Sequence, residues 1–173
     1  MVAGKDGDFS RFAKTQVERV SDRELLIQRS FRASAKTVFR AMTEPALLRR
    51  WWAPKLLGVV LFECESDARV GGRYRYVFGR PGEPPLAFSG TYTEVVPGTR
   101  LVYTQIFEPM PHAGEGLITA EFTESGGLTL LTQRERYPAK EVLDGALASG
   151  MERGMRETLE QLEALLAEVG DAA

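Results

Sequence analysis

Residues 139–169, AKEVLDGALASGMERGMRETLEQLEALLAEV, form the stretch that decides the fold. At 100° per residue, one side of this stretch is apolar and the opposite side is charged, which predicts one long amphipathic helix. The apolar side carries Leu143, Leu147, Met151, Gly154, Met155, Thr158, Leu162 and Leu165. A side this wide must be covered by another layer of the fold.

Three glycines interrupt the predicted helix, at Gly145, Gly150 and Gly154. A glycine inside a helix costs about 1 kcal/mol relative to alanine. Gly154 lies in the middle of the apolar side, between Met151 and Met155. We expect the glycine to make room for a closely approaching sheet or for a ligand, and these three residues to form the floor of a pocket.

The composition is that of an ordinary soluble domain. The chain has 173 residues, 43% of them hydrophobic and 27% charged, which fits one domain with a sizeable core. A net charge of -2 lacks the basic surface that nucleic acids require. No apolar run approaches the roughly 18 residues of a membrane span, and the N-terminus lacks the apolar core of a signal peptide. We therefore expect a cytoplasmic protein without nucleic-acid or membrane partners.

Before the helix, the pattern changes to that of strands. Residues 1–13 are polar and predict a flexible N-terminal segment, followed by a single domain over residues 14–169. Residues 24–31 predict the first strand, and two short helices follow, over 35–42 and from Thr43 to about Trp52. Further strands are predicted from residue 58 onward and over 73–78, 86–96, 100–107, 116–123 and 128–137.

This order of elements predicts the architecture. Consecutive strands joined by short turns form an antiparallel sheet, and helices separated from strands indicate the α+β class. We expect a curved antiparallel sheet of about six to seven strands, wrapped around the long C-terminal helix. Aromatic side chains of the strands would then point at the helix methionines and enclose a cavity.

Several short stretches resemble one known family. They are RSFRA (29–33), VFRAMTEP (38–45), LRRWWAP (48–54), DARVGGRY (67–74), GTYTEVVP (90–97), RLVYT (100–104) and GMERGM (150–155). Together they resemble the START-like, helix-grip (SRPBCC) superfamily, and within it the bacterial AHSA-like group, which is similar to the C-terminal domain of an activator of a heat-shock chaperone ATPase. The resemblance covers about residues 15–167 and implies the helix-grip fold.

The resemblance also implies a choice of functions. Members of the superfamily bind hydrophobic or amphipathic small molecules, cyclise polyketides or stimulate a chaperone in the stress response. Two departures stand out: many relatives have Gly-Trp where this chain has Gly154-Met155, and many have a histidine on the final strand, where this chain has Gln133-Arg134-Glu135. Any chemistry that relies on that histidine is therefore in doubt here.

The predicted cavity lies between the last helix and the strands. Alternation alone leaves open which strand aromatics face inward. As ligand-binding residues we expect Trp52, Phe62, Tyr76, Phe88, Tyr103, Met151, Gly154 and Met155. Of the pair Trp51-Trp52, one is expected to fill the core and the other to pack at the open end of the sheet, where it could act as a lid.

Residues capable of catalysis are sparse. His112 is the single histidine and Cys64 the single cysteine, so we expect no metal site, no cofactor and no catalytic residue, with Cys64 a buried inert thiol. Arg73 and Arg75 fit a solvated strand face with local ion pairs, although one of them could meet an acidic ligand. Glu121, Glu124 and Glu135 could form an acid-base pair, but the same pattern arises on the outer face of a sheet.

Three functions remain open from the sequence. The first is binding of an unidentified hydrophobic or amphipathic small molecule in the cavity. The second is a protein-interaction role with a chaperone partner, and the third is a polyketide cyclase-like enzyme. The sequence favours a non-enzymatic role, and we expect the protein to be a monomer or a homodimer.

Overall fold

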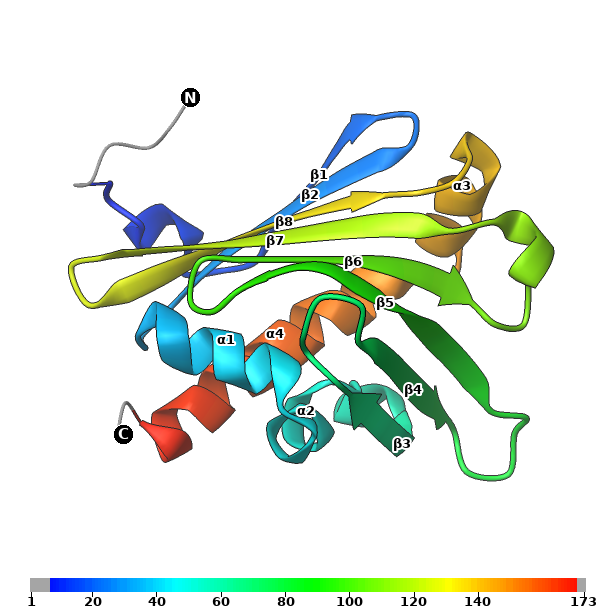
Figure 1. The fold of residues 1–173 in the computed structure, drawn as a ribbon, viewed down its shortest axis with the longest axis horizontal. Coiled ribbons are helices and arrows are strands. Elements are labelled where there is room, and N and C mark those ends of the chain that lie inside the picture. Colours follow the sequence, from blue (N-terminus) through cyan, green and yellow to red (C-terminus); the bar gives the residue numbers. More distant parts are fainter. Residues whose placement is uncertain (1–6, 171–173) are drawn as a thin grey trace.

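One curved antiparallel sheet is the frame of the computed structural model, which describes residues 7–170 (Figure 1). Its eight strands are β1 (Gln16–Ser21), β2 (Glu24–Phe31), β3 (Val60–Ser66), β4 (Arg73–Gly79), β5 (Leu86–Val96), β6 (Arg100–Phe107), β7 (Gly116–Ser125) and β8 (Leu128–Arg136). They are hydrogen-bonded in the order β1-β2-β8-β7-β6-β5-β4-β3.

The helices lie apart from the strands in the sequence, so the predicted α+β helix-grip fold is confirmed. They are α1 (Ala35–Thr43), α2 (Pro45–Trp51), α3 (Lys140–Ala148) and α4 (Met151–Val169), with 3-10 turns at Ser10–Phe12, Lys55–Leu57 and Pro111–Ala113. The sheet has eight strands instead of six to seven because residues 16–21 form an additional edge strand against β2. No helix within residues 7–170 is long and apolar enough to cross a membrane.

The first short helix begins where the sequence predicts, and the second begins at Pro45, two residues after the predicted start at Thr43. The Ser34 hydroxyl accepts a hydrogen bond of 3.2 Å from the backbone N–H of Thr37, which caps α1. Pro45 occupies the first position of α2, where its missing N–H is not needed.

The long C-terminal helix is broken, contrary to the prediction of one continuous helix. α3 ends at Ala148, and Gly150 has a φ of +85°, a left-handed conformation that ends one helix before α4 begins. Gly150 is therefore a junction between two helices rather than a position inside one. Figure 1 shows α4 crossing beneath the curved sheet, with α3 at the far end of β8.

The second half of α4 packs tightly. Leu159, Leu162, Leu165 and Leu166 are at most 6% exposed and share one core with Phe31 of β2 and Val38 of α1. This end of the molecule is filled with aliphatic side chains and holds the helix against the sheet.

Arg29 ties β2 to α4 in the same region. Its side chain is 5% exposed, donates to the backbone carbonyls of Ala13 and Ser30, and pairs with Glu160 of α4 at 3.2 Å. A buried guanidinium with several acceptors is a structural link rather than a free charge.

The opposite face of the sheet carries a second, smaller core. Phe9 and Phe12 are both 4% exposed and pack against Leu130 of β8. Residues 1–6 of the expected flexible segment lie outside the described residues. The described part of that segment differs from the expectation, since two buried phenylalanines hold it on the sheet.

Candidate functional site

The inner face of the sheet, which looks toward α3 and α4, brings together the candidate site. Strand residues alternate between faces, and register joins inward-facing residues of neighbouring strands in rows. One such row contains Leu25, Glu135, Ile118, Tyr103 and Tyr92. The neighbouring row contains Ile27, Gln133, Ala120 and Leu101.

Glu135 is the main polar group of the first row. Its residue is 8% exposed, and its neighbours across the two adjoining strands are Leu25 and Ile118, which are 1% and 4% exposed. The carboxylate accepts hydrogen bonds from the Gln133 amide at 2.7 Å and the Tyr137 hydroxyl at 3.0 Å. Burial raises the pKa of Glu135, and these two hydrogen bonds oppose the rise.

Four tyrosines extend the polar surface toward β3. The rings of Tyr74, Tyr76, Tyr92 and Tyr103 pack against one another with centroids 5.0–5.8 Å apart. The Tyr74 hydroxyl donates to the Thr104 carbonyl at 2.6 Å. The Tyr92 hydroxyl bonds to the Ser66 hydroxyl at 2.7 Å and also to Tyr76.

Tyr103 differs from the other three tyrosines. Its hydroxyl forms no hydrogen bond with any described residue, although burial and the nearby Glu135 both raise the pKa of this phenol. A half-buried phenol that can both donate and accept is therefore left with spare hydrogen-bonding capacity.

Side chains around this group are incompletely covered. Tyr103, Gln105 and Phe107 along β6 are half-buried, as are Met151 and Met155 of α4. This contrasts with the leucines of the second half of α4, which are at most 6% exposed. The helix and the sheet are thus closely packed at one end and accessible at the other. We call Tyr103, Gln133, Glu135, Tyr137 and Met151 the inner polar cluster.

A comparison with models of known protein families identifies the family of this chain. The family model described as Activator of Hsp90 ATPase homolog 1-like protein (AHSA1) matches residues 32–167, which include both short helices, the six strands β3 to β8, α3 and most of α4. The chain belongs to the AHSA1 family. The resemblance seen in the sequence motifs is confirmed.

Solved structures support the same assignment of this AHSA1-like domain. A Rhodobacter sphaeroides protein is 27% identical with a TM-score of 0.81, the match covering 91% of this chain and 100% of that one. A Chromobacterium violaceum protein is 28% identical with a TM-score of 0.73, over 84% and 97% of the chains. A Rhizobium loti protein is 30% identical with a TM-score of 0.63, over 88% and 99%. A comparison with curated proteins found no match.

Several predicted ligand-binding residues of the AHSA1-like domain do lie together on the inner face. Trp52 is half-buried, and its indole lies 5.0 Å from the ring of Tyr76, 5.1 Å from Phe78 and 6.2 Å from Phe88. Trp51 instead is 6% exposed and donates its indole N–H to the Ala41 carbonyl at 2.8 Å. Trp51 is thus the core residue, and Trp52 covers the strand aromatics.

Met151 and Met155 lie in different surroundings. The Met151 sulfur lies 3.4 Å from the Tyr137 hydroxyl, which places Met151 directly at the inner polar cluster. Met155 is half-buried, one turn further along α4, and packs on the edge of the main core.

Phe62 does not join them. A β-bulge between Leu61 and Glu63 breaks the alternation of β3, so Cys64 turns inward while Phe62 stays 44% exposed. The sequence pattern grouped Phe62 with Cys64 on one face because a bulge leaves no mark in simple alternation. Phe62 therefore lies away from the inner polar cluster.

Gly154 faces a different neighbour from the one expected. A Cβ at this position would lie 3.6 Å from Pro54 and 3.7 Å from Leu57, both in the segment between α2 and β3. The glycine thus adjoins that segment and not the strand aromatics.

The arginines of β4 lie on the outer face. Arg75 pairs with Glu108 at 2.9 Å and Glu63 at 3.2 Å, in a surface hollow of about 370 Å³ that Arg73 and Glu65 also line. The favoured expectation of local ion pairs on a solvated strand face describes this arrangement.

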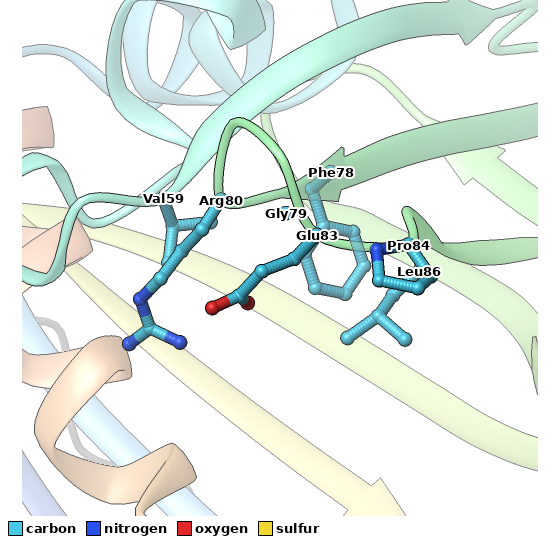
Figure 2. A pocket seen from close by; sticks show the side chains of 7 residues that line it. All are labelled: Val59, Phe78, Gly79, Arg80, Glu83, Pro84 and Leu86. Atoms are coloured by element: carbon cyan, nitrogen blue, oxygen red, sulfur yellow. The ribbon is translucent and has the colours of Figure 1, made fainter.

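A second surface hollow, of about 250 Å³, lies at the turn between β4 and β5. Val59, Arg80 and Glu83 line it together with Phe78, Pro84 and Leu86, as Figure 2 shows. The Arg80 guanidinium donates to the Leu57 carbonyl at 2.9 Å. Neither hollow is lined by a residue of the inner polar cluster, although Tyr74, which lines the larger hollow, packs against Tyr103 with ring centroids 5.3 Å apart.

The remaining candidate groups are isolated. Cys64 is buried, and burial raises the pKa of its thiol. Within residues 7–170, no three side chains of His, Cys, Asp or Glu are grouped so that they could hold a metal ion.

The sequence left open whether Glu135 belongs to an acid-base pair or to the outer face of the sheet, and the structure buries it on the inner face. Glu135 shares the parity of Leu131 and Gln133, and Leu131 is 1% exposed in the main core. This alternation indicates an inward-facing Glu135, but its charge argues against burial, because buried carboxylates are rare. Gln133 and Tyr137 were missed as polar neighbours for the same reason.

Proposed function

We propose that this AHSA1-like domain binds an amphipathic small molecule between the inner face of the sheet, α3 and the first half of α4. One observation carries the proposal: inward-facing residues at this end are only half-buried, although they surround buried polar groups. A packed core without a ligand role would exclude water from Tyr103 and Met151 as it does from Leu162.

The chemistry of the lining supports an amphipathic ligand. Trp52, Phe88 and Met155 offer large apolar surfaces, and methionine adapts to ligands of irregular shape. Glu135 and Tyr103 offer a polar end in the same space. Binding pockets commonly combine a mostly apolar lining with a few placed polar groups.

Titration with N-phenyl-1-naphthylamine, a neutral apolar fluorophore, tests the site. We expect fluorescence enhancement with the wild-type protein and at least a tenfold weaker affinity for Met151→Trp, whose indole would occupy the space. Leu117→Trp is the matched control, because Leu117 is 38% exposed and faces away from α4.

Native mass spectrometry of protein purified from its source gives a second readout. A co-purifying small molecule that Met151→Trp no longer retains would support the proposal. Equal probe binding by wild type and Met151→Trp, with both variants folded, would contradict it.

The family description favours one further candidate, an activator role toward an Hsp90-type chaperone. The test is the ATP turnover of such a chaperone with and without this domain. A rise in turnover that survives Met151→Trp would support an activator role independent of the inner site.

A further inference from the structure

We infer that the ligand of the inner polar cluster carries an ammonium head group that binds the Glu135 carboxylate. This inference rests on the proposed function and adds the chemical class of the ligand. It comes from the charge balance of the buried face.

Glu135 lacks a cation. Its hydrogen-bond partners are the Gln133 amide and the Tyr137 hydroxyl, both neutral, and no lysine, arginine or histidine of residues 7–170 forms an ion pair with it. Other carboxylates of the domain, such as Glu108 and Glu121, pair with arginine although they lie closer to solvent. Among residues 7–170, the most deeply buried carboxylate is therefore one that has no ionic partner.

Within residues 7–170, the one buried cationic side chain, Arg29, is already paired. Arg29 projects from β2 opposite Leu131, whereas Glu135 lies opposite Leu25, at the other end of the same strand pair. The Arg29 guanidinium is held by two backbone carbonyls and by Glu160. It is not available to Glu135.

An ammonium group fits the hydrogen-bonding positions of Glu135 and Tyr103 that remain unfilled. An ionised carboxylate has about four acceptor positions, and two of those of Glu135 are filled. An ammonium group offers three donors, enough for the Glu135 oxygens and the unpartnered oxygen of Tyr103. Aromatic faces also attract cations, and the ring of Tyr103 packs against the rings of Tyr74 and Tyr92.

The same geometry disfavours other heads. A carboxylate head would place two negative charges together in a region of low dielectric, where their repulsion is strong. A hydroxyl head would add a hydrogen bond but leave the charge of Glu135 unbalanced.

Three ligands of equal chain length test the head group. Decylamine, 1-decanol and decanoate are compared at pH 7.5 by displacement of N-phenyl-1-naphthylamine, because an alkylamine is protonated there as a lysine is. We expect decylamine to bind about tenfold or more tightly than the other two. Glu135→Gln, which keeps the side-chain shape, should remove this preference.

The matched control is Glu121→Gln. Glu121 is a half-exposed carboxylate on the outer face of β7, so the same chemical change there should leave the preference intact. Tyr103→Phe should weaken decylamine more than decanol, and it keeps the ring packing if Glu135→Gln is unstable.

The outcomes separate the two proposals. Equal affinity of the three ligands, or tighter binding of decanoate, would overturn the ammonium inference and leave the binding site in place. Failure of all three ligands and of the fluorophore to bind would overturn both.

Discussion

Tyr103 and Glu135 lie in one row of the sheet, on opposite sides of Ile118, which pairs with both of them. Adjacent strands are about 4.8 Å apart, so the Cα atoms of the two residues are separated by roughly 10 Å. Their side chains share the inner face of the sheet, and the negative charge of Glu135 helps to raise the pKa of the Tyr103 phenol. This row combines one acid, Glu135, with two phenols, Tyr103 and Tyr92.

The raised pKa of Glu135 predicts how stability depends on pH. The folded protein holds the proton more tightly than the unfolded chain, whose glutamates titrate near 4.5. Stability from this group is therefore fully present below that pH and is lost as pH rises through the folded-state pKa. Glu135→Gln should gain stability relative to wild type between pH 4 and pH 8.

Urea unfolding of both proteins at the two pH values measures this change. Glu121→Gln, at an exposed position, should show little change with pH. A stability difference between Glu135→Gln and wild type that is the same at pH 4 and pH 8 would contradict the prediction.

The glycines of the C-terminal segment predict opposite effects of alanine. Gly154 is helical with ordinary room for a Cβ, so Gly154→Ala should stabilise by about 0.5–1 kcal/mol. Gly150 has a positive φ, so Gly150→Ala should destabilise by about 1 kcal/mol. Thermal unfolding of the pair measures both signs.

A larger side chain at Gly154 should act on stability rather than on binding. Leucine there would collide with Pro54 and Leu57, so Gly154→Leu should lower the melting temperature. A variant with wild-type stability that no longer binds N-phenyl-1-naphthylamine would instead place the site at Gly154.

Phe12 should matter more than its place near the N-terminus indicates. It is 4% exposed against Leu130, so Phe12→Ala should cost about 3 kcal/mol of unfolding free energy. Arg11→Ala is the control, because Arg11 lies at the surface with its guanidinium 4.5 Å from the Phe12 ring centroid and should cost less than about 1 kcal/mol. The denaturant midpoints of the two variants, compared with that of the wild type, measure these two losses of stability.

The two tryptophans should be distinguishable by quenching. Trp51 is buried with its indole N–H bonded, whereas Trp52 is half-buried over Tyr76 and Phe78. Iodide should quench the emission of Trp51→Phe, which retains Trp52, more strongly than that of Trp52→Phe. Equal quenching of both variants would show that Trp52 is as protected as Trp51.

The sequence predicted the elements well because their signals are local. Ser34 and Pro45 start the short helices where capping rules place them. The alternation of Tyr74, Tyr76 and Phe78 puts these residues on one face of β4, since no bulge interrupts that strand, although alternation alone did not say which face is inward.

The candidate site was harder because its determinants are not local. The bulge beside Phe62 and the left-handed Gly150 depend on backbone geometry that residue types only permit. Glu135 is buried because β2 and β7 flank β8, and alternation within one strand cannot state what lies on either side.

The strand order has a consequence for how the domain is made. β2 pairs with β8, from Phe31 opposite Thr129 to Glu24 opposite Arg136. During synthesis, β2 therefore leaves the ribosome well before its partner β8 does. Closing such a long loop is slow, because contacts distant in sequence form late in folding. Until β8 is synthesised, the apolar face of β2 is uncovered, and a nascent chain halted before that point would be exposed to aggregation and to proteases.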